Sequence, residues 1–124
     1  MKRGWVLVIS VALVACSSFY LDTADILRDA NKHNLKKLSV GMEKSTAMEV
    51  MGTEPSKGLF MWIDNPYRRE WVTAKNGRRY EVLYYYTDLK ERDDKITDDE
   101  LTPLIFEGGK LVGWGHGAFQ RLGT

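Results

Sequence analysis

Residues 67–87 read YRREWVTAKNGRRYEVLYYYT, and this stretch decides the fold class. The dipeptide Asn76-Gly77 separates two runs rich in aromatic and β-branched residues, which is the strongest short-range signal for a β-hairpin. A two-residue loop at this dipeptide gives the cross-strand pairs Lys75 with Arg78, Thr73 with Tyr80, and Trp71 with Val82. The stretch therefore predicts two antiparallel strands.

This register assigns each side chain to one face of the hairpin, because successive residues of a strand point to opposite sides. The face that we expect in the core carries Trp71, Thr73, Tyr80, Val82 and Tyr84. Tyr85 falls on the opposite face, where we expect it to be exposed to solvent. Trp71 and Val82 should lie beneath the helix predicted over residues 46–51.

Residues 101–114 predict a second hairpin, in which Gly108-Gly109 forms the loop and Glu107 pairs with Lys110. Both faces of this hairpin are apolar. One carries Leu104, Phe106 and Leu111, and the other carries Ile105, Val112 and Trp114. We favour the first as core, and the second is either covered by the C-terminal tail or free as a docking surface. The glycines that interrupt the last strand, at 113, 115 and 117, predict a bend or bulge.

Two helices precede the strands. Residues 22–33 carry a narrow apolar stripe of Ile26, Leu27 and Ala30 behind residues that can cap the first turn. Within GMEKSTAMEVMGTEP, residues 41–55, apolar residues recur at helical spacing, Gly52 suits a helix end and Pro55 prevents continuation. Helices followed by hairpins predict an α+β domain of two layers, with N-terminal helices packed on an antiparallel sheet of three or four strands.

Two segments connect these elements. The apolar run Leu59–Ile63, which includes Trp62, is either a short edge strand or a loop packed on the core, and an exposed partner site is the third reading. Residues 88–100 are densely charged but contain no glycine for the sharp turn of a calcium loop. We expect them to form a solvated loop.

The stretch 41–55 resembles the SmpA/OmlA family, the small lipoproteins of the machine that assembles outer-membrane β-barrels. The match rests on Gly41-Met42 before the short helix and on Met51-Gly52 and Pro55 after it. Glu43 stands where that family prefers Ser or Thr as the cap. The resemblance implies helices packed on an antiparallel sheet, and a role in outer-membrane protein assembly or envelope integrity.

The N-terminus carries an export signal. Lys2 and Arg3 precede an apolar run from Val6 to Ala15, too short for a stable membrane span, which needs about 20 apolar residues. Its end, Leu13-Val14-Ala15-Cys16, resembles the lipobox of bacterial lipoproteins, which implies a covalent lipid on Cys16 and cleavage before it. Cys16 is the single cysteine of the chain, so an internal disulfide is impossible and lipidation gives the residue a role.

These signals divide the chain into three parts: residues 1–15 as a lipoprotein signal peptide, 16–21 as a lipidated tether, and 22–124 as a single domain. In Gram-negative lipoproteins an Asp after the lipidated Cys marks retention in the inner membrane, and Ser17 stands there in this chain. The resemblance therefore implies the outer membrane, on its periplasmic face, as the location.

The net charge of the chain limits the classes of partner that it can bind. Removal of residues 1–15 lowers the count of Lys and Arg from 18 to 16, against 17 Asp and Glu, so the mature chain is close to neutral. A nucleic-acid-binding protein would instead show a basic field. We expect a membrane contact through the lipid anchor and an envelope protein as partner.

No active site is recognisable in the sequence. The two histidines, His33 and His116, have no partners at metal-ligand spacing, and no Ser lies in the setting of a hydrolase nucleophile. We therefore expect neither an enzyme, nor a metal, nor a cofactor apart from the lipid. Gly115 and Gly117 indicate a bend, because we expect no helix after them to receive an anion.

The favoured function is thus a binding or scaffolding lipoprotein of the cell envelope. The alternative is an inhibitor- or ligand-binding module, because the helix-then-sheet unit also resembles half of a β-lactamase inhibitor protein. Aromatic and apolar groups predominate at protein interfaces. The partner-binding candidates outside the predicted core are Trp62, Tyr85, Ile105, Val112 and Trp114.

Overall fold

The structure is a computed structural model that describes residues 23–58, 61–93 and 95–123. Its helices are α2 (Thr23–Asn34), α3 (Lys44–Met51) and α4 (His116–Gln120), with 3₁₀ turns η1 (Leu35–Lys37) and η2 (Asp98–Glu100). Its strands are β1 (Ser56–Lys57), β2 (Trp62–Ile63), β3 (Arg68–Thr73), β4 (Arg79–Tyr86), β5 (Leu101–Glu107) and β6 (Lys110–Trp114). The predicted α+β class is confirmed. The predicted signal peptide, Cys16 and the predicted tether lie outside the described residues.

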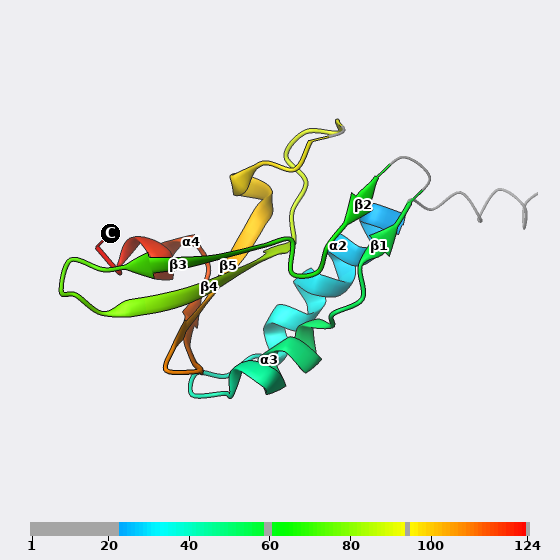
Figure 1. The fold of residues 1–124 in the computed structure, drawn as a ribbon. Helices are drawn as coiled ribbons and strands as arrows, with labels where there is room; N and C mark the ends of the chain where they lie inside the picture. The colour runs from blue at the N-terminus through cyan, green and yellow to red at the C-terminus, as the bar shows by residue number, and fades with distance from the viewer. Residues whose placement is uncertain (1–22, 59–60, 94, 124) are drawn as a thin grey trace, which may run out of the picture.

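The strands form two antiparallel sheets, a β1–β2 pair and a four-stranded sheet in the order β3-β4-β5-β6 (Figure 1). On one face, Ala47 and Met51 of α3 join Leu38 and the sheet residues Leu83, Tyr85, Leu104, Phe106 and Leu111 in one buried cluster. On the other face, the short helix α4 and the residues after it pack against Tyr80, Val82, Tyr84 and Ile105. The sheet is therefore covered on both sides over much of its area.

The motif around α3 has a clear structural role. Gly52 follows α3 with φ +85° and ψ 154°, a conformation that is essentially restricted to glycine, and its N–H donates to the carbonyl of Met48 at 2.8 Å. Ala47, on the side of α3 that packs against the sheet, is completely buried. Glu43 precedes α3 in an extended conformation without a side-chain capping bond. The short helix α3 therefore depends on packing and on Gly52 at its C-terminal end, and not on a side-chain cap at its N-terminal end.

The segment before α3 covers part of the β6 edge. The N–H of Gly41 donates to the carbonyl of Leu111 at 2.7 Å, and the N–H of Leu111 donates to the carbonyl of Met42 at 2.8 Å. Nearer the turn, Lys110 Nζ lies 3.0 Å from Glu43 Oε1. These contacts attach the start of α3 to the edge of the sheet.

The first hairpin is present, but its predicted register is wrong by one residue. The N–H of Ala74 donates to the carbonyl of Arg78, so the loop is Lys75-Asn76-Gly77, with Gly77 at φ +85°. A three-residue loop of this kind ends on a residue with positive φ. The shift pairs Trp71 with Glu81 and Val72 with Tyr80, and it reverses the faces of β3.

That shift moves Trp71 out of the predicted core. Its side chain is 59% exposed and lies against Arg79, whose guanidinium is 5.0 Å from the ring centroid. Val72 packs instead against the cluster on the α4 side of the sheet. Val82 is fully buried, but in that same cluster, on the face opposite α3. The expectation that Trp71 and Val82 lie beneath residues 46–51 is therefore wrong.

The second hairpin has the predicted Glu107–Lys110 pair and the predicted core of Leu104, Phe106 and Leu111. A register shift between Ile105 and Phe106 makes Ile105 pair with Gly113 and Leu104 with Trp114. A bulge of this kind adds one residue to one strand and therefore alters which side chains share a face. Trp114 consequently packs with the α3-side cluster and not with Ile105.

Helix α2 matches the predicted range, but its buried residue is polar. Ile26 is 55% exposed, whereas Asn31 is fully buried. The side-chain amide of Asn31 donates to Oδ1 of Asn65 at 2.9 Å and to the carbonyl of Tyr86 at 3.0 Å. The predicted stripe is thus confirmed for Leu27, which packs against a core cluster, and is wrong for Ile26 and Ala30, which are exposed.

Asn65 continues this network, and it precedes a cis peptide bond to Pro66. Its side-chain amide donates to the carbonyl of Gly52 at 3.0 Å and, more weakly, to that of Met51 at 3.4 Å. Two buried amides therefore join α2, the end of α3, the turn before β3 and the end of β4. We call Asn31 and Asn65 the buried amide pair.

The charged segment 88–100 is organised by its last residue. Glu100 is 2% exposed, and its carboxylate accepts hydrogen bonds from the N–H groups of Lys90 at 3.0 Å and Thr97 at 2.9 Å. Thr97 and Glu100 form a capping box at the start of η2. Glu100 therefore holds the two ends of the segment together.

The buried amide pair predicts a specific pattern of destabilisation. Asn31→Ala removes two hydrogen bonds and leaves buried acceptors unpaired, so we expect it to lower the free energy of unfolding by about 1–3 kcal/mol. Asn31→Asp should cost more, because it places an acceptor against the oxygens of Asn65 and Tyr86. Urea unfolding measures both.

The matched control is Lys32→Ala, on the exposed side of the same helix, which should leave the unfolding midpoint unchanged. If Asn31→Ala and Lys32→Ala unfold at the same urea concentration, the amide pair does not hold the helices to the sheet.

Candidate functional site

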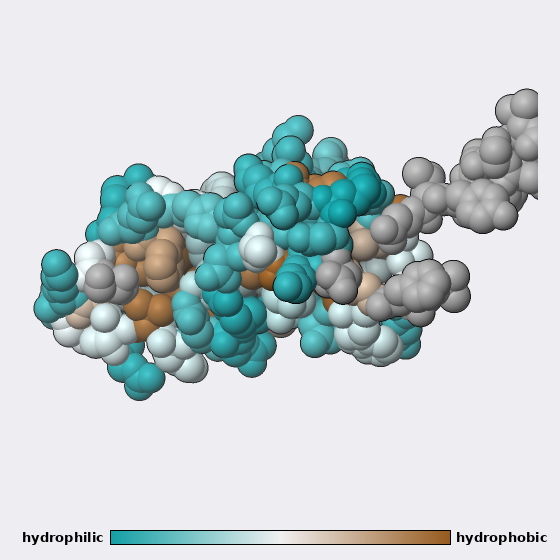
Figure 2. Space-filling view, turned by 90° about the horizontal axis from the view of Figure 1, so that it is seen from above, coloured by the Kyte–Doolittle hydropathy of each residue, from teal (hydrophilic) through white to brown (hydrophobic). Residues whose placement is uncertain are grey.

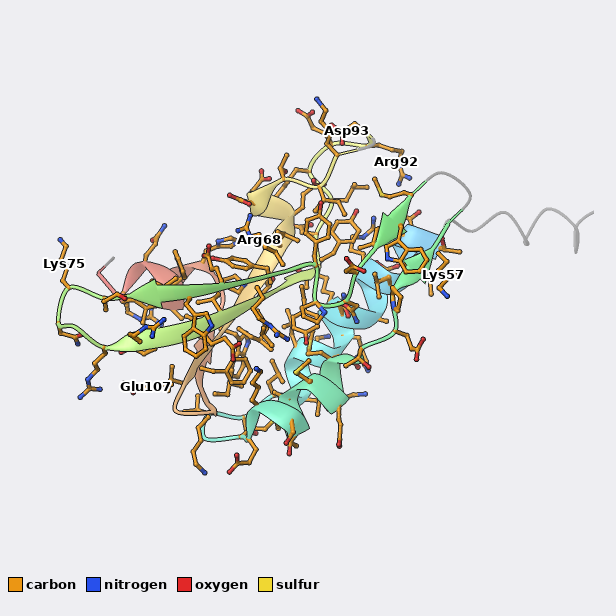
Figure 3. All side chains as sticks on the ribbon, viewed as in Figure 1. Lys57, Arg68, Lys75, Arg92, Asp93 and Glu107 are labelled. Atoms are coloured by element: carbon orange, nitrogen blue, oxygen red, sulfur yellow. The ribbon has the colours of Figure 1, made fainter. Side chains whose placement is uncertain are left out.

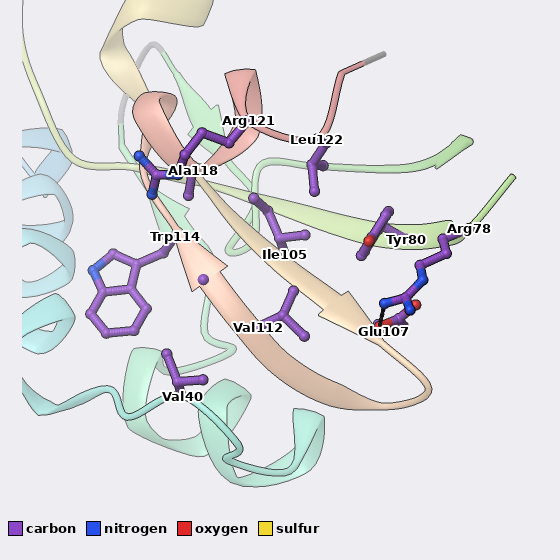
Figure 4. Close-up of a pocket in the computed structure, with 11 residues that line it drawn as sticks. Val40, Arg78, Tyr80, Ile105, Glu107, Val112, Trp114, Ala118, Arg121 and Leu122 are labelled. Carbon is purple, nitrogen blue, oxygen red and sulfur yellow. Dashed lines mark ion pairs between the residues drawn. The ribbon is translucent and has the colours of Figure 1, made fainter. Parts of the chain in front are cut away.

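A hollow lies on the α4 side of the main sheet, where it crosses β4 and β5 and reaches the edge of β6 (Figure 4). It has a volume of about 530 Å³ and is open to solvent. We call it the β6 groove, and its lining residues are Val40, Arg78, Tyr80, Ile105, Glu107, Val112, Gly113, Trp114, Ala118, Arg121 and Leu122. Seen from above, hydrophobic residues are also visible at the end of the molecule that carries α4 and the C-terminus (Figure 2).

Two valines form the exposed apolar part of the β6 groove. Val40 is 69% exposed, and Val112 is 40% exposed. Val40 directly precedes Gly41, whose N–H donates to the carbonyl of Leu111 on β6. Val112 lies on β6 itself. Since a valine side chain gains about 1.5–3 kcal/mol when fully buried, this pair can contribute measurably to binding.

Trp114 borders the same groove but is half-buried. Its pairing with Leu104 places it among the residues packed on the α3-side cluster, and Figure 4 shows its indole on the side of the sheet toward the N-terminal helices. A Trp114→Ala change would therefore remove core packing as well as groove surface. We therefore expect Trp114→Ala to lower the melting temperature as well as to change the groove.

Charged side chains lie at the rim of the β6 groove. Arg78 Nη1 is 3.6 Å from Glu107 Oε1 in a loose, exposed ion pair, and Arg121 lines the hollow from the C-terminal side. Exposed pairs of this type contribute little stability, so Arg78 can exchange Glu107 for another carboxylate. The groove thus combines apolar side chains with guanidinium groups that recognise acidic groups.

The structure brings together three of the five predicted contact residues: Ile105, Val112 and Trp114 line the β6 groove. Ile105, however, is only 1% exposed, because the C-terminal segment with α4 covers it. Of the two alternatives for this face, cover by the tail is confirmed for Ile105. Val40 and α4 are not predicted from the sequence; the available signal for Val40 was a lone apolar residue between Ser39 and Gly41.

The other two candidates lie elsewhere. Tyr85 is fully buried under α3, so the prediction that it is exposed is wrong. The uninterrupted apolar run 82–86 already indicated a strand buried on both faces. Trp62 is 58% exposed at the β1–β2 pair, beside a second hollow of about 480 Å³. Leu59 and Phe60 of the same apolar run lie outside the described residues.

Polar clusters elsewhere hold elements together. Glu81 is 8% exposed, and its carboxylate lies 2.7 Å from Lys44 Nζ at the start of α3 and 3.6 Å from Arg69 Nε on β3.

The exposed His116 is the first residue of α4, so the expectation that no helix follows the glycines is wrong. The ring N–H of His116 donates to the carbonyl of Leu101 at 2.8 Å.

Within the described residues 23–58, 61–93 and 95–123, His, Cys, Asp and Glu form no group of three placed to hold a metal ion. In the same ranges, no helix has the length and apolar character needed to cross a bilayer.

Two neighbouring tyrosines on β4 differ in their surroundings. Burial raises the pKa of Tyr85 to about 12, and its hydroxyl has no hydrogen-bond partner within the described part of the chain. Burial, together with a hydrogen bond to Glu70, also raises the pKa of Tyr84 to about 12. The guanidinium of Arg68 lies 4.2 Å from the Tyr84 ring centroid and opposes that increase.

Comparison with known proteins gives a match to one family model. Residues 22–121 match the model described as "Protein of unknown function (DUF3192)". Neither the curated proteins nor the solved structures gave a match. The matched range corresponds to the described domain.

The tyrosine pair predicts how stability depends on alkaline pH. The pKa of a tyrosine in the unfolded chain is about 10, below the folded values of about 12 for Tyr84 and Tyr85. Their contribution to stability is therefore complete below about pH 10 and is lost as the pH rises toward 12. Urea unfolding as a function of pH measures the loss.

Tyr85→Phe should make that loss shallower while leaving stability at pH 7 unchanged or slightly higher, because it removes an unpaired buried hydroxyl. Tyr84→Phe is the matched control and should lower stability at pH 7, since it breaks the bond to Glu70. An alkaline profile unaltered by both substitutions would contradict the assignment.

Proposed function

The chain belongs to the DUF3192 family, and we propose that it is a lipid-anchored protein of the cell envelope that binds another envelope protein through the β6 groove. Cys16 carries the lipid, and residues 16–21 tether the domain to the periplasmic face of the outer membrane. The protein acts by contact and not by catalysis, and it needs no cofactor besides the covalent lipid.

The anchor is supported by the sequence alone. A basic start, an apolar run of signal-peptide length and Leu13-Val14-Ala15-Cys16 follow one another in the order of a lipoprotein signal. Several acyl chains, at about 0.8 kcal/mol per buried CH₂, hold a protein on a membrane almost permanently. Helix α2 begins at Thr23, so only a short tether separates the domain from the lipid.

The β6 groove is the observation that carries the binding role. An edge strand offers unpaired backbone groups to a further strand, and residues 41–44 cover the edge of β6 only near its turn. Beyond that cover, exposed Val112 and Val40 flank the hollow, and Arg78 and Arg121 stand at its rim. We propose that the occupant is an extended segment of a partner with apolar and acidic side chains.

The relation to the SmpA/OmlA lipoproteins is part of this proposal. Helices α2 and α3, the second of which ends at Gly52, precede an antiparallel sheet, in the order that the resemblance implies. By that analogy, the partner belongs to the machinery that assembles outer-membrane proteins or maintains the envelope. The fold class alone does not distinguish these roles, because one fold supports many functions.

The second candidate function is an inhibitor-type module that binds a soluble enzyme through the open part of its sheet. The observation that favours it is Trp71, which stands 59% exposed on the edge strand β3 with Arg79 against its ring. Tryptophan and arginine are the residues most enriched in interface hot spots. Substitutions on β3 and in the β6 groove therefore separate the two functions.

The anchor is tested by Cys16→Ser. We expect the variant to lose palmitate labelling and to leave the outer-membrane fraction, because a hydroxyl does not replace the thiol in lipid transfer. It should accumulate as a precursor or as a soluble form. Continued labelling and outer-membrane fractionation would show that Cys16 is not lipidated.

The groove is tested by Val40→Ser combined with Val112→Thr, which replace exposed methyl groups by hydroxyls at similar size. Loss of two apolar contacts should weaken partner binding by about tenfold and leave the unfolding midpoint unchanged. Photo-crosslinkers at positions 40 and 112, followed by mass spectrometry, identify the partner, and its binding to both forms is then measured.

Trp71→Ala is the control on the other edge of the sheet. If Trp71→Ala weakens capture and the double valine variant does not, the inhibitor-type function replaces the groove. Capture of a single soluble enzyme, instead of envelope assembly proteins, would point in the same direction.

A further inference from the structure

We infer that the end of the domain where α2 begins rests on the lipid bilayer, with Trp62 as its main contact. We call this surface the Trp62 face and define it by Lys57, Met61, Trp62 and Tyr67. The inference rests on the anchor proposed above and adds an orientation to it: the lipid holds the protein on the membrane, and the Trp62 face fixes which side points toward it.

The exposed side chains of this face are unusually large for a free surface. Trp62 is 58% exposed and Tyr67 is 37% exposed. Met61, Trp62 and Tyr67 line the second hollow together with Lys95, Ile96 and Thr97. Large apolar groups gathered on one surface indicate a contact site.

The position of this face relative to the tether decides its occupant. Gly58, between β1 and β2, approaches the first residue of α2 so closely that a Cβ there would lie 3.0 Å from Thr23 Oγ1. Cys16 to Asp22 is a stretch of seven residues, which spans at most about 25 Å when fully extended. A lipid on Cys16 therefore keeps the β1–β2 pair close to the bilayer surface.

The chemistry of the face suits the interfacial region of a bilayer. Trp and Tyr place an apolar ring and a polar group at the boundary between hydrocarbon and water. Trp62 Nε1 donates to Asp64 Oδ1 at 2.8 Å, and Lys57 Nζ lies 5.0 Å from the Trp62 ring centroid. The aliphatic part of a lysine can lie along the lipid while its ammonium stays among the headgroups.

Charges of both signs surround the Trp62 face, so the contact does not require an anionic membrane. Lys57 and Lys95 are accompanied by Asp64, while Arg92 Nη1 lies 3.6 Å from Asp25 Oδ2 on the first turn of α2. Orientation therefore depends on aromatic and aliphatic groups, and the covalent lipid provides most of the affinity.

Trp71 is the natural comparison for Trp62. The two indoles are equally exposed, at 59% and 58%, and each has a cation 5.0 Å from its ring centroid. Trp71 lies on β3, close to the turn that carries Lys75, and Figure 3 shows Lys57 and Lys75 at opposite ends of the molecule. The inference predicts contact with lipid for Trp62 and not for Trp71.

The experiment uses the lipidated protein, purified from membranes and reconstituted in nanodiscs of phosphatidylethanolamine and phosphatidylglycerol with brominated acyl chains. Signal cleavage removes Trp5, so Trp71→Phe with Trp114→Phe leaves Trp62 alone, and Trp62→Phe with Trp114→Phe leaves Trp71 alone. Bromine quenches indole fluorescence at short range. We expect several-fold stronger quenching of Trp62 than of Trp71, together with a blue shift of the Trp62 emission.

The outcomes separate the orientation from the anchor. Mass spectrometry of the purified protein first reports the lipid on Cys16, and its absence would overturn the proposed anchor. With the lipid present, equal or absent quenching of Trp62 would overturn the inference. Protection of Trp62 from an aqueous quencher in native envelopes but not in the nanodiscs would also overturn it, because a protein and not lipid would then cover this face.

Discussion

The buried amide pair is the interaction on which the arrangement of the helices depends. A single contact between Asn31 and Asn65 joins four separate segments, because each amide also bonds to a backbone carbonyl of another element. Such carbonyls, at a helix end and at a strand end, would otherwise be buried without donors at a cost of about 1–3 kcal/mol each. The network thereby fixes α2 beside the sheet and closes the end of α3.

The domain has two ends with different exposed surfaces. At the β1–β2 end, α2 begins and the side chains of the Trp62 face are exposed. Farther along the sheet, α3 and α4 cover opposite faces, and the β6 groove is open on the α4 side. With the proposed lipid anchor at the first end, the groove would face away from the membrane.

The position of the β6 groove follows from how the two edge strands of the main sheet are covered. The connection before α3 pairs with β6 near its turn, and the bulge between β5 and β6 turns Trp114 toward the helices. The opposite edge, β3, carries Arg68, Arg69 and Glu70, charges that discourage another strand from pairing. The sheet thus has one charged edge and one edge that remains apolar in part.

The sequence by itself determined the two hairpins, the helices α2 and α3 and the α+β class, but neither α4 nor the length of the first turn. Gly108-Gly109 correctly predicted the pairing of Glu107 with Lys110, and Gly52 correctly predicted the end of α3, because each depends on local backbone geometry. Tertiary structure decided which faces are buried. Asn-Gly serves two- and three-residue loops alike, so only packing of Val72, not Trp71, against the α4-side cluster sets the register. Likewise, Tyr85 and Ile105 are buried because elements distant in sequence, α3 and α4, cover them, and no local pattern encodes a distant cover.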